Sequence, residues 1–199
     1  MIVNTLEFYM SKVVSIILAV IILILFYTFG IYNRIQTVDE DVTTAWSEVI
    51  NQYQRRADLI PNIVNSVKDY SVDKKQALTD VVNARDKAIS VQTSSDMLND
   101  STVFRKFIQA QDQLSSFLAR LLQTVEQSSS LTANSEFKSL QTQLEGIEKQ
   151  ITITRNRYIK IVGDYNLMLQ KFPGNILAGI MGYNTKPNLK GTNKVSIAN

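Results

Sequence analysis

The stretch VVSIILAVIILILFYTFGIY, Val13–Tyr32, contains twenty residues and no charged side chain. The hydrocarbon core of a bilayer is about 30 Å thick, and about 20 helical residues cross it. Because backbone groups inside lipid must bond to one another, an α-helix is the structure expected here. A buried core helix rarely runs this long without a polar face, and the apolar run of a cleaved signal peptide is shorter. The sequence therefore predicts a single transmembrane helix over 13–32, preceded by a leader over 1–12.

Composition excludes several classes of chemistry. The chain of 199 residues has no cysteine and no histidine, so it has neither the ligands of a usual zinc site nor the bases of common catalytic triads. No glycine occurs between Ile31 and Glu145, which excludes a P-loop or a Rossmann fingerprint in that region. We therefore expect no cofactor and no metal, and we predict that the protein is not an enzyme.

Beyond the span the sequence is typical of long helices with few turns. Apolar residues recur at steps of three and four, the period of one helix face, and predict helices over 33–70, 74–92, 102–127 and 137–172. The polar stretches 71–73, 93–101 and 127–134 are predicted to be a turn and two loops. Pro61 should kink the first helix or begin a new segment, because its ring removes one backbone hydrogen bond.

The last of these helices has the most regular seam. Its apolar positions alternate steps of three and four over five heptads: Phe137, Leu140, Leu144, Ile147, Ile151, Thr154, Tyr158, Ile161, Tyr165, Met168 and Phe172. Three other amphipathic helices are available to cover this seam, which favours a bundle core over an intermolecular coiled coil. The predicted fold is all-α: a transmembrane helix followed by an antiparallel bundle of about four long helices over 33–172.

Register arithmetic brings several charged residues together. If short turns join antiparallel helices, Asp58 lies opposite Arg85, and Arg55 and Arg56 lie near Glu148. We therefore predict an inter-helix polar network of these five residues, with a contact between Asp58 and Arg85. Paired charges inside a bundle more often set its alignment than its chemistry, so a structural role is favoured over a catalytic one.

The segment 173–199 combines an apolar stretch with a basic tail. Antiparallel packing would return Phe172–Tyr183 to the bilayer surface, where an apolar segment with adjacent lysines suits the headgroup region. The membrane-surface residues predicted are Lys171, Ile176, Leu177, Ile180, Lys186, Lys190 and Lys194. Alternatively, the apolar residues cap the base of the bundle. Because basic residues gather in the tail and not on the folded body, no nucleic-acid partner is expected.

Three blocks of this sequence are similar to a known family: RRADLIPNIV at Arg55–Val64, DYN at Asp164–Asn166 and FPGNILAG at Phe172–Gly179. In order and spacing the chain resembles the LemA family of bacterial membrane proteins. The family-motif residues that we single out are Pro61, Asn62, Tyr165, Asn166 and Pro173. The resemblance implies an N-terminal anchor, a helical bundle and no established catalytic activity. One branch of the family takes part in building magnetosome membranes, so by analogy the resemblance favours a membrane-organising role.

These observations favour a membrane-anchored helical scaffold or adaptor. Its expected partners are membrane lipid, other membrane-associated proteins and further copies of the chain. We expect a single-pass cell-membrane protein, with its bulk domain slightly favoured on the cytoplasmic side because the basic tail suits the anionic leaflet. The first alternative is a membrane-anchored sensor or signalling component. A lesser alternative is an enzyme subunit that uses the Arg/Asp/Glu cluster.

Overall fold

The computed structural model describes residues 2–68, 75–92, 97–127 and 134–189, and within these ranges it is helical and has no strand. The helices are α1 (Ile2–Lys68), α2 (Lys75–Gln92), α3 (Ser101–Glu126), α5 (Ser135–Gln170) and α6 (Gly174–Met181). The all-α prediction is confirmed. The predicted turn at 71–73 lies outside the described residues, as do 93–96 and 128–133 of the two predicted loops.

Contacts divide the chain into two compact units. The anchor unit comprises Met1–Glu40 and Tyr165–Thr185, and the bundle unit comprises Asp41–Asp164 and Lys186–Asn199. The two long helices α1 and α5 each contribute to both units. Each unit is described separately below.

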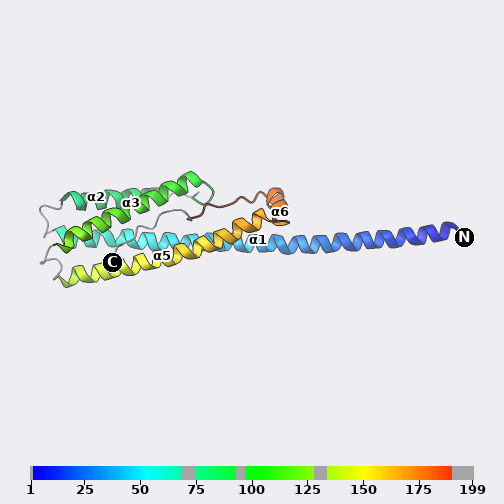
Figure 1. Cartoon of the computed structure of the whole chain (residues 1–199), viewed down its shortest axis with the longest axis horizontal. Coiled ribbons are helices and arrows are strands. Elements are labelled where there is room, and N and C mark those ends of the chain that lie inside the picture. Colours follow the sequence, from blue (N-terminus) through cyan, green and yellow to red (C-terminus); the bar gives the residue numbers. More distant parts are fainter. Residues whose placement is uncertain (1, 69–74, 93–96, 128–133, 190–199) are drawn as a thin grey trace. The chain divides into compact units, whose positions relative to one another are not determined.

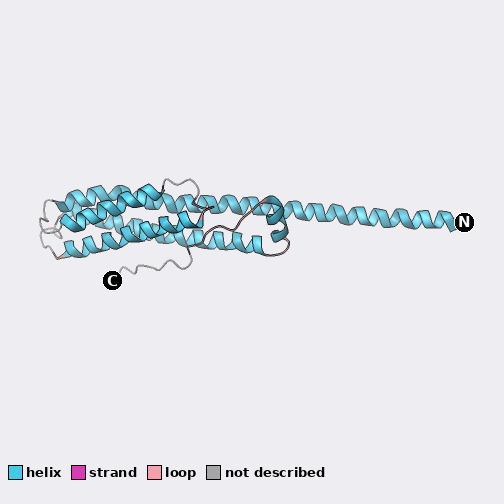
Figure 2. Ribbon diagram, turned by 90° about the horizontal axis from the view of Figure 1, so that it is seen from above, coloured by secondary structure: helices cyan, strands magenta, loops and turns pink. Residues whose placement is uncertain are grey.

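Four helical segments share the core of the bundle unit. Figures 1 and 2 show α2, α3 and the adjoining parts of α1 and α5 side by side. The predicted seams are the buried faces: every seam position of α3, from Phe104 to Val125, is buried. The core residues include Val49, Ile60, Val81, Ala88, Leu114, Leu121, Leu144 and Ile151. Each helix therefore buries the face that the sequence period predicted.

Contacts between side chains show the direction of each helix. Residues with higher numbers on α1 contact residues with lower numbers on α2 and on α5, so α1 is antiparallel to both helices. Residues of α1 meet increasing numbers on α3, which therefore runs parallel to α1. The pairs with α2 and α5 are Gln54 with Gln92, Ala57 with Arg85, Glu48 with Arg157 and Arg56 with Glu148. This is the up-and-down order that short connections predict.

Side-chain caps fix the starts of two helices. The Asp100 carboxylate accepts hydrogen bonds from the backbone N–H groups of Thr102 at 2.7 Å and Val103 at 3.2 Å. These bonds favour the ionised form and lower the pKa of Asp100. Asn134 caps α5 in the same way, with its side-chain oxygen 2.8 Å from the N–H of Glu136. The caps explain why α3 and α5 begin within two residues of their predicted starts.

Helix α1 is longer than predicted, because it includes the described part of the leader and continues through Pro61 to Lys68. Proline lacks an N–H, so the carbonyl of Ala57, four residues earlier, loses its helical donor. The Nε–H of Arg85 donates to that carbonyl at 2.9 Å. Pro61 itself is exposed. A side chain from α2 thus replaces the bond that proline removes, and α1 does not begin a new segment here.

This substitution of donors gives a testable prediction. Arg85→Leu should lower the free energy of unfolding by about 1–3 kcal/mol, because the buried Ala57 carbonyl is left unpaired. In a chain that carries Pro61→Ala, the restored N–H can bond to this carbonyl, so the same Arg85→Leu change should cost less. Urea unfolding of the four variants measures the coupling as a double-mutant cycle. If Arg85→Leu lowers the free energy of unfolding equally in both backgrounds, the Arg85 bond does not compensate for the missing N–H of Pro61.

The anchor unit contains the apolar stretch of α1, the end of α5, and α6. Gly174 begins α6 so close to α5 that a Cβ atom would collide with the carbonyl oxygen of Met168. Gly182 ends α6 with a φ of 76°, in the left-handed region that glycine adopts without steric cost. The N–H of Tyr183 then bonds to the carbonyl of Ala178 at 3.0 Å. The FPGN motif therefore makes a tight connection from α5 into α6.

Candidate functional site

The largest buried polar side chain of the bundle unit is Arg56 on α1, which is 1 % exposed. Its Nη1 donates to Glu148 Oε1 of α5 at 3.0 Å and to Ser115 Oγ of α3 at 2.6 Å. Its Nη2 donates to the side-chain oxygen of Gln111 at 2.6 Å and to the Gln111 carbonyl at 3.1 Å. One guanidinium thus joins α1, α3 and α5, which fixes their mutual register.

A second arginine completes this polar layer. Nη1 of Arg155 on α5 donates to the Tyr53 hydroxyl at 2.7 Å, and the Arg56 guanidinium carbon lies 5.1 Å from the centre of the Tyr53 ring. Burial raises the pKa of Tyr53, and the two arginines partly oppose that rise. Burial also raises the pKa of Asp112, and the charges of Arg155 and Arg56 partly offset this rise. Two cations, Arg56 and Arg155, therefore lie near two carboxyl groups, Glu148 and Asp112; Arg56 is buried and the other three residues are half-buried.

The structure brings together only part of the predicted five-residue network. Arg56 and Glu148 form the predicted pair. Arg55, the residue before Arg56 on α1, is exposed. The predicted contact between Asp58 and Arg85 is wrong: Asp58 is exposed and accepts from Gln54 Nε2 at 2.8 Å. Arg85 instead pairs with the neighbouring Asp86 at 3.0 Å, besides serving the Ala57 carbonyl.

The reason for this error is rotation around α1. Successive residues of an α-helix point about 100° apart, so being at the right level does not place a side chain at the interface. Ala57 faces the core and is 2 % exposed, whereas Asp58 faces outward. Arg85 therefore meets α1 one residue away from its predicted partner: it bonds to the carbonyl of Ala57 and not to the carboxylate of Asp58.

Next to this layer lies an aromatic cluster around Trp46. The ring centre of Trp46 is 5.0 Å from those of Phe104 and Tyr158 and 5.7 Å from that of Phe107. Phe107 also packs edge-on against Tyr53 at 5.5 Å. Rings at these separations and tilts attract each other beyond the area they bury. The cluster ties α1, α3 and α5 together a few residues from Arg56.

The chain after α6 packs on the bundle unit beside this cluster. The Tyr158 hydroxyl donates to the Pro187 carbonyl at 2.6 Å, and burial raises the pKa of Tyr158, so the phenol keeps the proton it donates. Asn188 Nδ2 lies 3.4 Å from the carbonyl of Ile159, and Leu189 is buried. The start of the predicted basic tail is therefore bundle structure.

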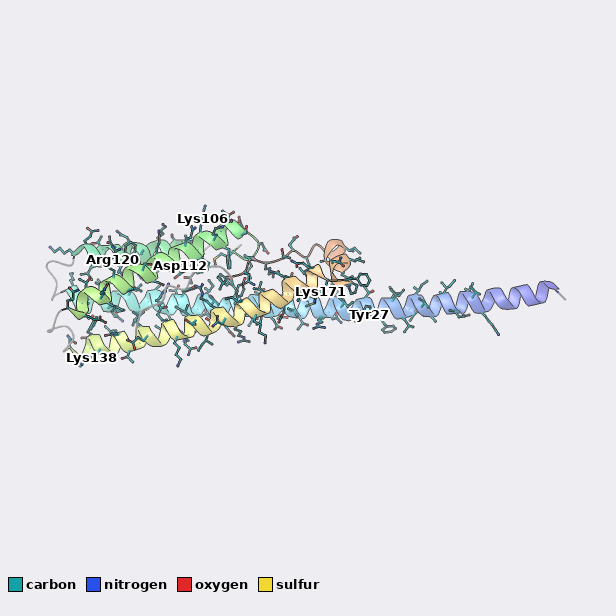
Figure 3. The ribbon with its side chains drawn as sticks, in the orientation of Figure 1. Tyr27, Lys106, Asp112, Arg120, Lys138 and Lys171 are labelled. Atoms are coloured by element: carbon teal, nitrogen blue, oxygen red, sulfur yellow. The ribbon has the colours of Figure 1, made fainter. Side chains whose placement is uncertain are left out.

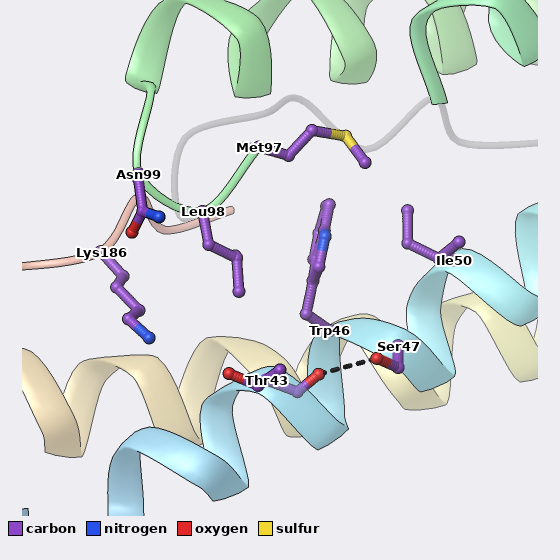
Figure 4. A pocket seen from close by; sticks show the side chains of 8 residues that line it. All are labelled: Thr43, Trp46, Ser47, Ile50, Met97, Leu98, Asn99 and Lys186. Carbon is purple, nitrogen blue, oxygen red and sulfur yellow. Dashed lines mark hydrogen bonds between the residues drawn. The ribbon is translucent and has the colours of Figure 1, made fainter. Parts of the chain in front are cut away.

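A pocket of about 340 Å³ opens beside Trp46 (Figure 4). Met97 and Leu98 from the segment before α3 and Lys186 from the chain after α6 line it. The other lining residues are Thr43, Ser47, Ile50 and Asn99. Lys186 was predicted at the membrane surface, and that role stays a prediction; in the structure Lys186 lines this pocket of the bundle unit. Lys190 and Lys194 lie outside the described residues.

In the anchor unit, α6 has two distinct faces. Leu177 and Ala178 are buried, whereas Ile176 and Ile180 are exposed. Figure 3 shows α6 next to the part of α1 that follows Tyr27, with Lys171 nearby and exposed. Leu177 thus packs within the anchor unit, whereas Ile176, Ile180 and Lys171 are exposed. Both sequence interpretations of this segment stay predictions.

The family-motif residues fall in different places. Pro61 and Asn62 are exposed on α1 in the bundle unit, and Pro61 matters through the carbonyl it leaves unpaired. Tyr165 is buried in the anchor unit, where burial and a hydrogen bond with Asp39 raise its pKa. Asn166 and Pro173, which follow Tyr165 in the sequence, are half-buried. Pro61 and Asn62 thus belong to the bundle unit and the other three to the anchor unit, and among these five residues Tyr165 is the buried one.

Five members of the polar layer were not predicted from the sequence: Tyr53, Gln111, Asp112, Ser115 and Arg155. Gln111 did carry a signal, because it is the one polar residue in the otherwise apolar seam of α3. A polar side chain at such a position needs a buried partner. Arg155 carried no comparable signal, since it is one of nine charged residues on α5.

Comparisons with known proteins give one family match and several similar curated proteins. The sequence model of the LemA family matches residues 45–197. Similar curated proteins include the magnetosome proteins MamQ 2 and MamQ 1 of Paramagnetospirillum magneticum, each 24% identical over 168 residues. MamQ of Magnetospirillum gryphiswaldense is 23% identical over 168 residues. Each match covers 76% of this chain and 62% of the relative, so the chain spans less than two thirds of the length of these relatives.

Proposed function

The chain belongs to the LemA family, and from that premise we propose that it is a membrane-anchored helical scaffold or adaptor. In this role the apolar stretch of α1 crosses the bilayer once, and the bundle gathers other proteins at the membrane or organises the bilayer. One observation carries the proposal. From Val13 to Phe29 the large apolar side chains of α1 are about half exposed or more, so no described part of the protein covers them. A row of this length is stable only in an apolar medium.

The use of the buried charges supports a structural role for the bundle. The Arg56 guanidinium makes four hydrogen bonds to α3 and α5, which join helices. The residues that line the pocket beside Trp46 do not include Arg56 or the residues bonded to it. A scaffold needs this kind of rigid alignment, because its partners bind to surfaces whose spacing the bundle fixes.

The cations near the apolar stretch support a cytoplasmic bundle. Arg34 follows the stretch on α1, and Lys171 is exposed in the same unit, whereas Lys12 stands at the other end. Lys and Arg are enriched on the cytoplasmic side of membrane helices. We place the bundle on that side, with anionic lipid, membrane-associated proteins or further copies of the chain as its partners.

Affinity purification of the full chain in mild detergent, after cross-linking in cells, tests the scaffold role. We expect reproducible co-purification of membrane-associated proteins or of a second, differently tagged copy. The matched control carries Leu23→Arg and Leu25→Arg, which place two charges in the apolar stretch and leave the bundle sequence unchanged. It should lose the membrane-dependent partners. A full chain that purifies as a monomer with the same background proteins as this control would contradict the proposal.

A further inference from the structure

The exposed face of α6 carries large apolar side chains. Ile176 is 53 % exposed and Ile180 is 73 % exposed, one helical turn apart. Phe172, one turn earlier in the chain, is 79 % exposed, and Met181 is 51 % exposed. The opposite side of α6 is packed, with Leu177 and Ala178 buried. Apolar groups gathered in this way on one short helix mark a contact with something other than water.

The position of α6 along α1 indicates what that contact is. On α1, Phe29 is still exposed, Ile31 and Tyr32 are half-buried, and Ile35 is fully buried. The side chains of α1 therefore begin to be buried where the uncharged stretch ends, just before Arg34. Figure 3 shows α6 beside this part of α1, just past Tyr27. The exposed face of α6 thus continues the apolar surface of α1 within the same unit.

The polar residues around α6 fit the edge of a bilayer. Lys171 is exposed immediately before Phe172, and Tyr27 is exposed on the neighbouring part of α1. Aromatic rings and lysines are typical of the zone between acyl chains and headgroups, because each combines an apolar body with a group that needs water or phosphate. An apolar row between a lysine and a membrane helix has the composition of a segment that lies in this zone.

We propose that Phe172 and α6 form an interfacial foot: a second membrane contact that lies in the headgroup zone of the bilayer crossed by α1. Phe172, Ile176 and Ile180 enter the upper acyl region, and Lys171 meets lipid phosphates. The inference rests on the proposed membrane anchor and adds its second lipid-binding site. With two contacts, the anchor unit cannot rotate freely about the axis of α1, so the foot sets how the chain faces the membrane.

The chain has no cysteine, so single cysteines can report the surroundings of chosen positions. The full chain carries Ile176→Cys or Ile180→Cys, labelled with a polarity-sensitive fluorophore and reconstituted into vesicles of phosphatidylcholine and phosphatidylglycerol. The matched control is Ile153→Cys, an isoleucine of α5 in the bundle unit that is 49 % exposed. Leu23→Cys, within the apolar stretch, is the reference for deep burial. Nitroxide lipids labelled near the headgroup or near the acyl end quench each fluorophore.

We expect the headgroup nitroxide to quench the fluorophores at 176 and 180 several-fold more than the one at 153. The acyl-end nitroxide should quench position 23 most strongly. If position 23 is quenched while positions 176 and 180 match position 153, the foot is wrong and the anchor stands. If position 23 is not quenched either, the proposed anchor itself fails. If the fluorophore at 180 emits as in an apolar environment but is not quenched by lipid nitroxides, protein, such as a second copy, covers α6. That result would also overturn the foot.

Discussion

Replacing Arg56 with leucine should lower the free energy of unfolding by about 3–5 kcal/mol, the usual cost of removing one partner of a buried ion pair. The change leaves Glu148, Gln111 and Ser115 without the donor that now joins them. Glu148 is 25 % exposed, so water can reach part of its carboxylate and the lower end of this range is expected. Chemical unfolding of the full chain in detergent, followed by circular dichroism, measures the loss.

The chain offers a matched control in the adjacent residue. Arg55→Leu makes the same chemical change at an exposed position, and its effect should stay within about 0.5 kcal/mol. A third variant, Arg56→Lys, keeps the charge but loses the planar fork that reaches two helices, so it should fall between the other two. Similar losses for Arg55→Leu and Arg56→Leu would remove Arg56 from the centre of the polar layer.

The second large effect is expected for Phe107→Ala, which should cost about 3–5 kcal/mol. Phe107 is fully buried, with the rings of Trp46 and Tyr53 packed against it at 5.7 Å and 5.5 Å. Truncation leaves a cavity that these two rings can close only by moving away from α3. Fluorescence of Trp46, the one tryptophan of the chain, should shift to the red as its surroundings loosen.

The same substitution at Phe172 is the control for this prediction. Phe172 is 79 % exposed, so Phe172→Ala should leave the unfolding free energy of the bundle within about 0.5 kcal/mol of the parent chain. If Phe107→Ala unfolds no more easily than Phe172→Ala, the aromatic cluster does not hold α1 against α3.

How far the sequence determines this fold can be seen in α3. Its buried face follows from spacing alone, because a helix repeats every 3.6 residues and apolar side chains avoid water. The pairing of Arg56 with Glu148 also followed from the sequence, since antiparallel helices with level ends bring those two positions together. Periodicity and register therefore predict which faces meet and at what height.

The errors arise where a single side chain chooses among neighbours. Phe172 continued the α5 heptad pattern, yet α5 ends at Gln170 and the ring is exposed. Pro61 was expected to kink α1 or begin a new segment; α1 begins no new segment there, and Arg85 on α2 donates to the carbonyl that proline leaves without a donor. Composition assigned Lys186 to a basic segment, and it did not predict that Lys186 lines a pocket of the bundle unit. Such outcomes depend on tertiary contacts, which local patterns do not contain.

The candidate site shows the same division. One polar residue in an apolar seam, Gln111, could have indicated a buried network on α3, whereas Arg155 and Ser115 could not have been selected from many similar surface residues. The segment that we propose as the foot was visible in the sequence as an apolar stretch beside lysines. Which of its residues face outward needed the structure, because Ile176 and Leu177 are adjacent and of similar hydropathy.

The central claim is that α1 crosses the bilayer and holds the bundle on one side of it. The most direct measurement labels single cysteines with a membrane-impermeant maleimide, before and after permeabilisation of intact cells. Asn4→Cys lies before the apolar stretch, and Ser135→Cys lies at the exposed start of α5. The account predicts labelling from opposite sides: Asn4→Cys in intact cells and Ser135→Cys only after permeabilisation. Labelling of both positions from the same side would contradict it.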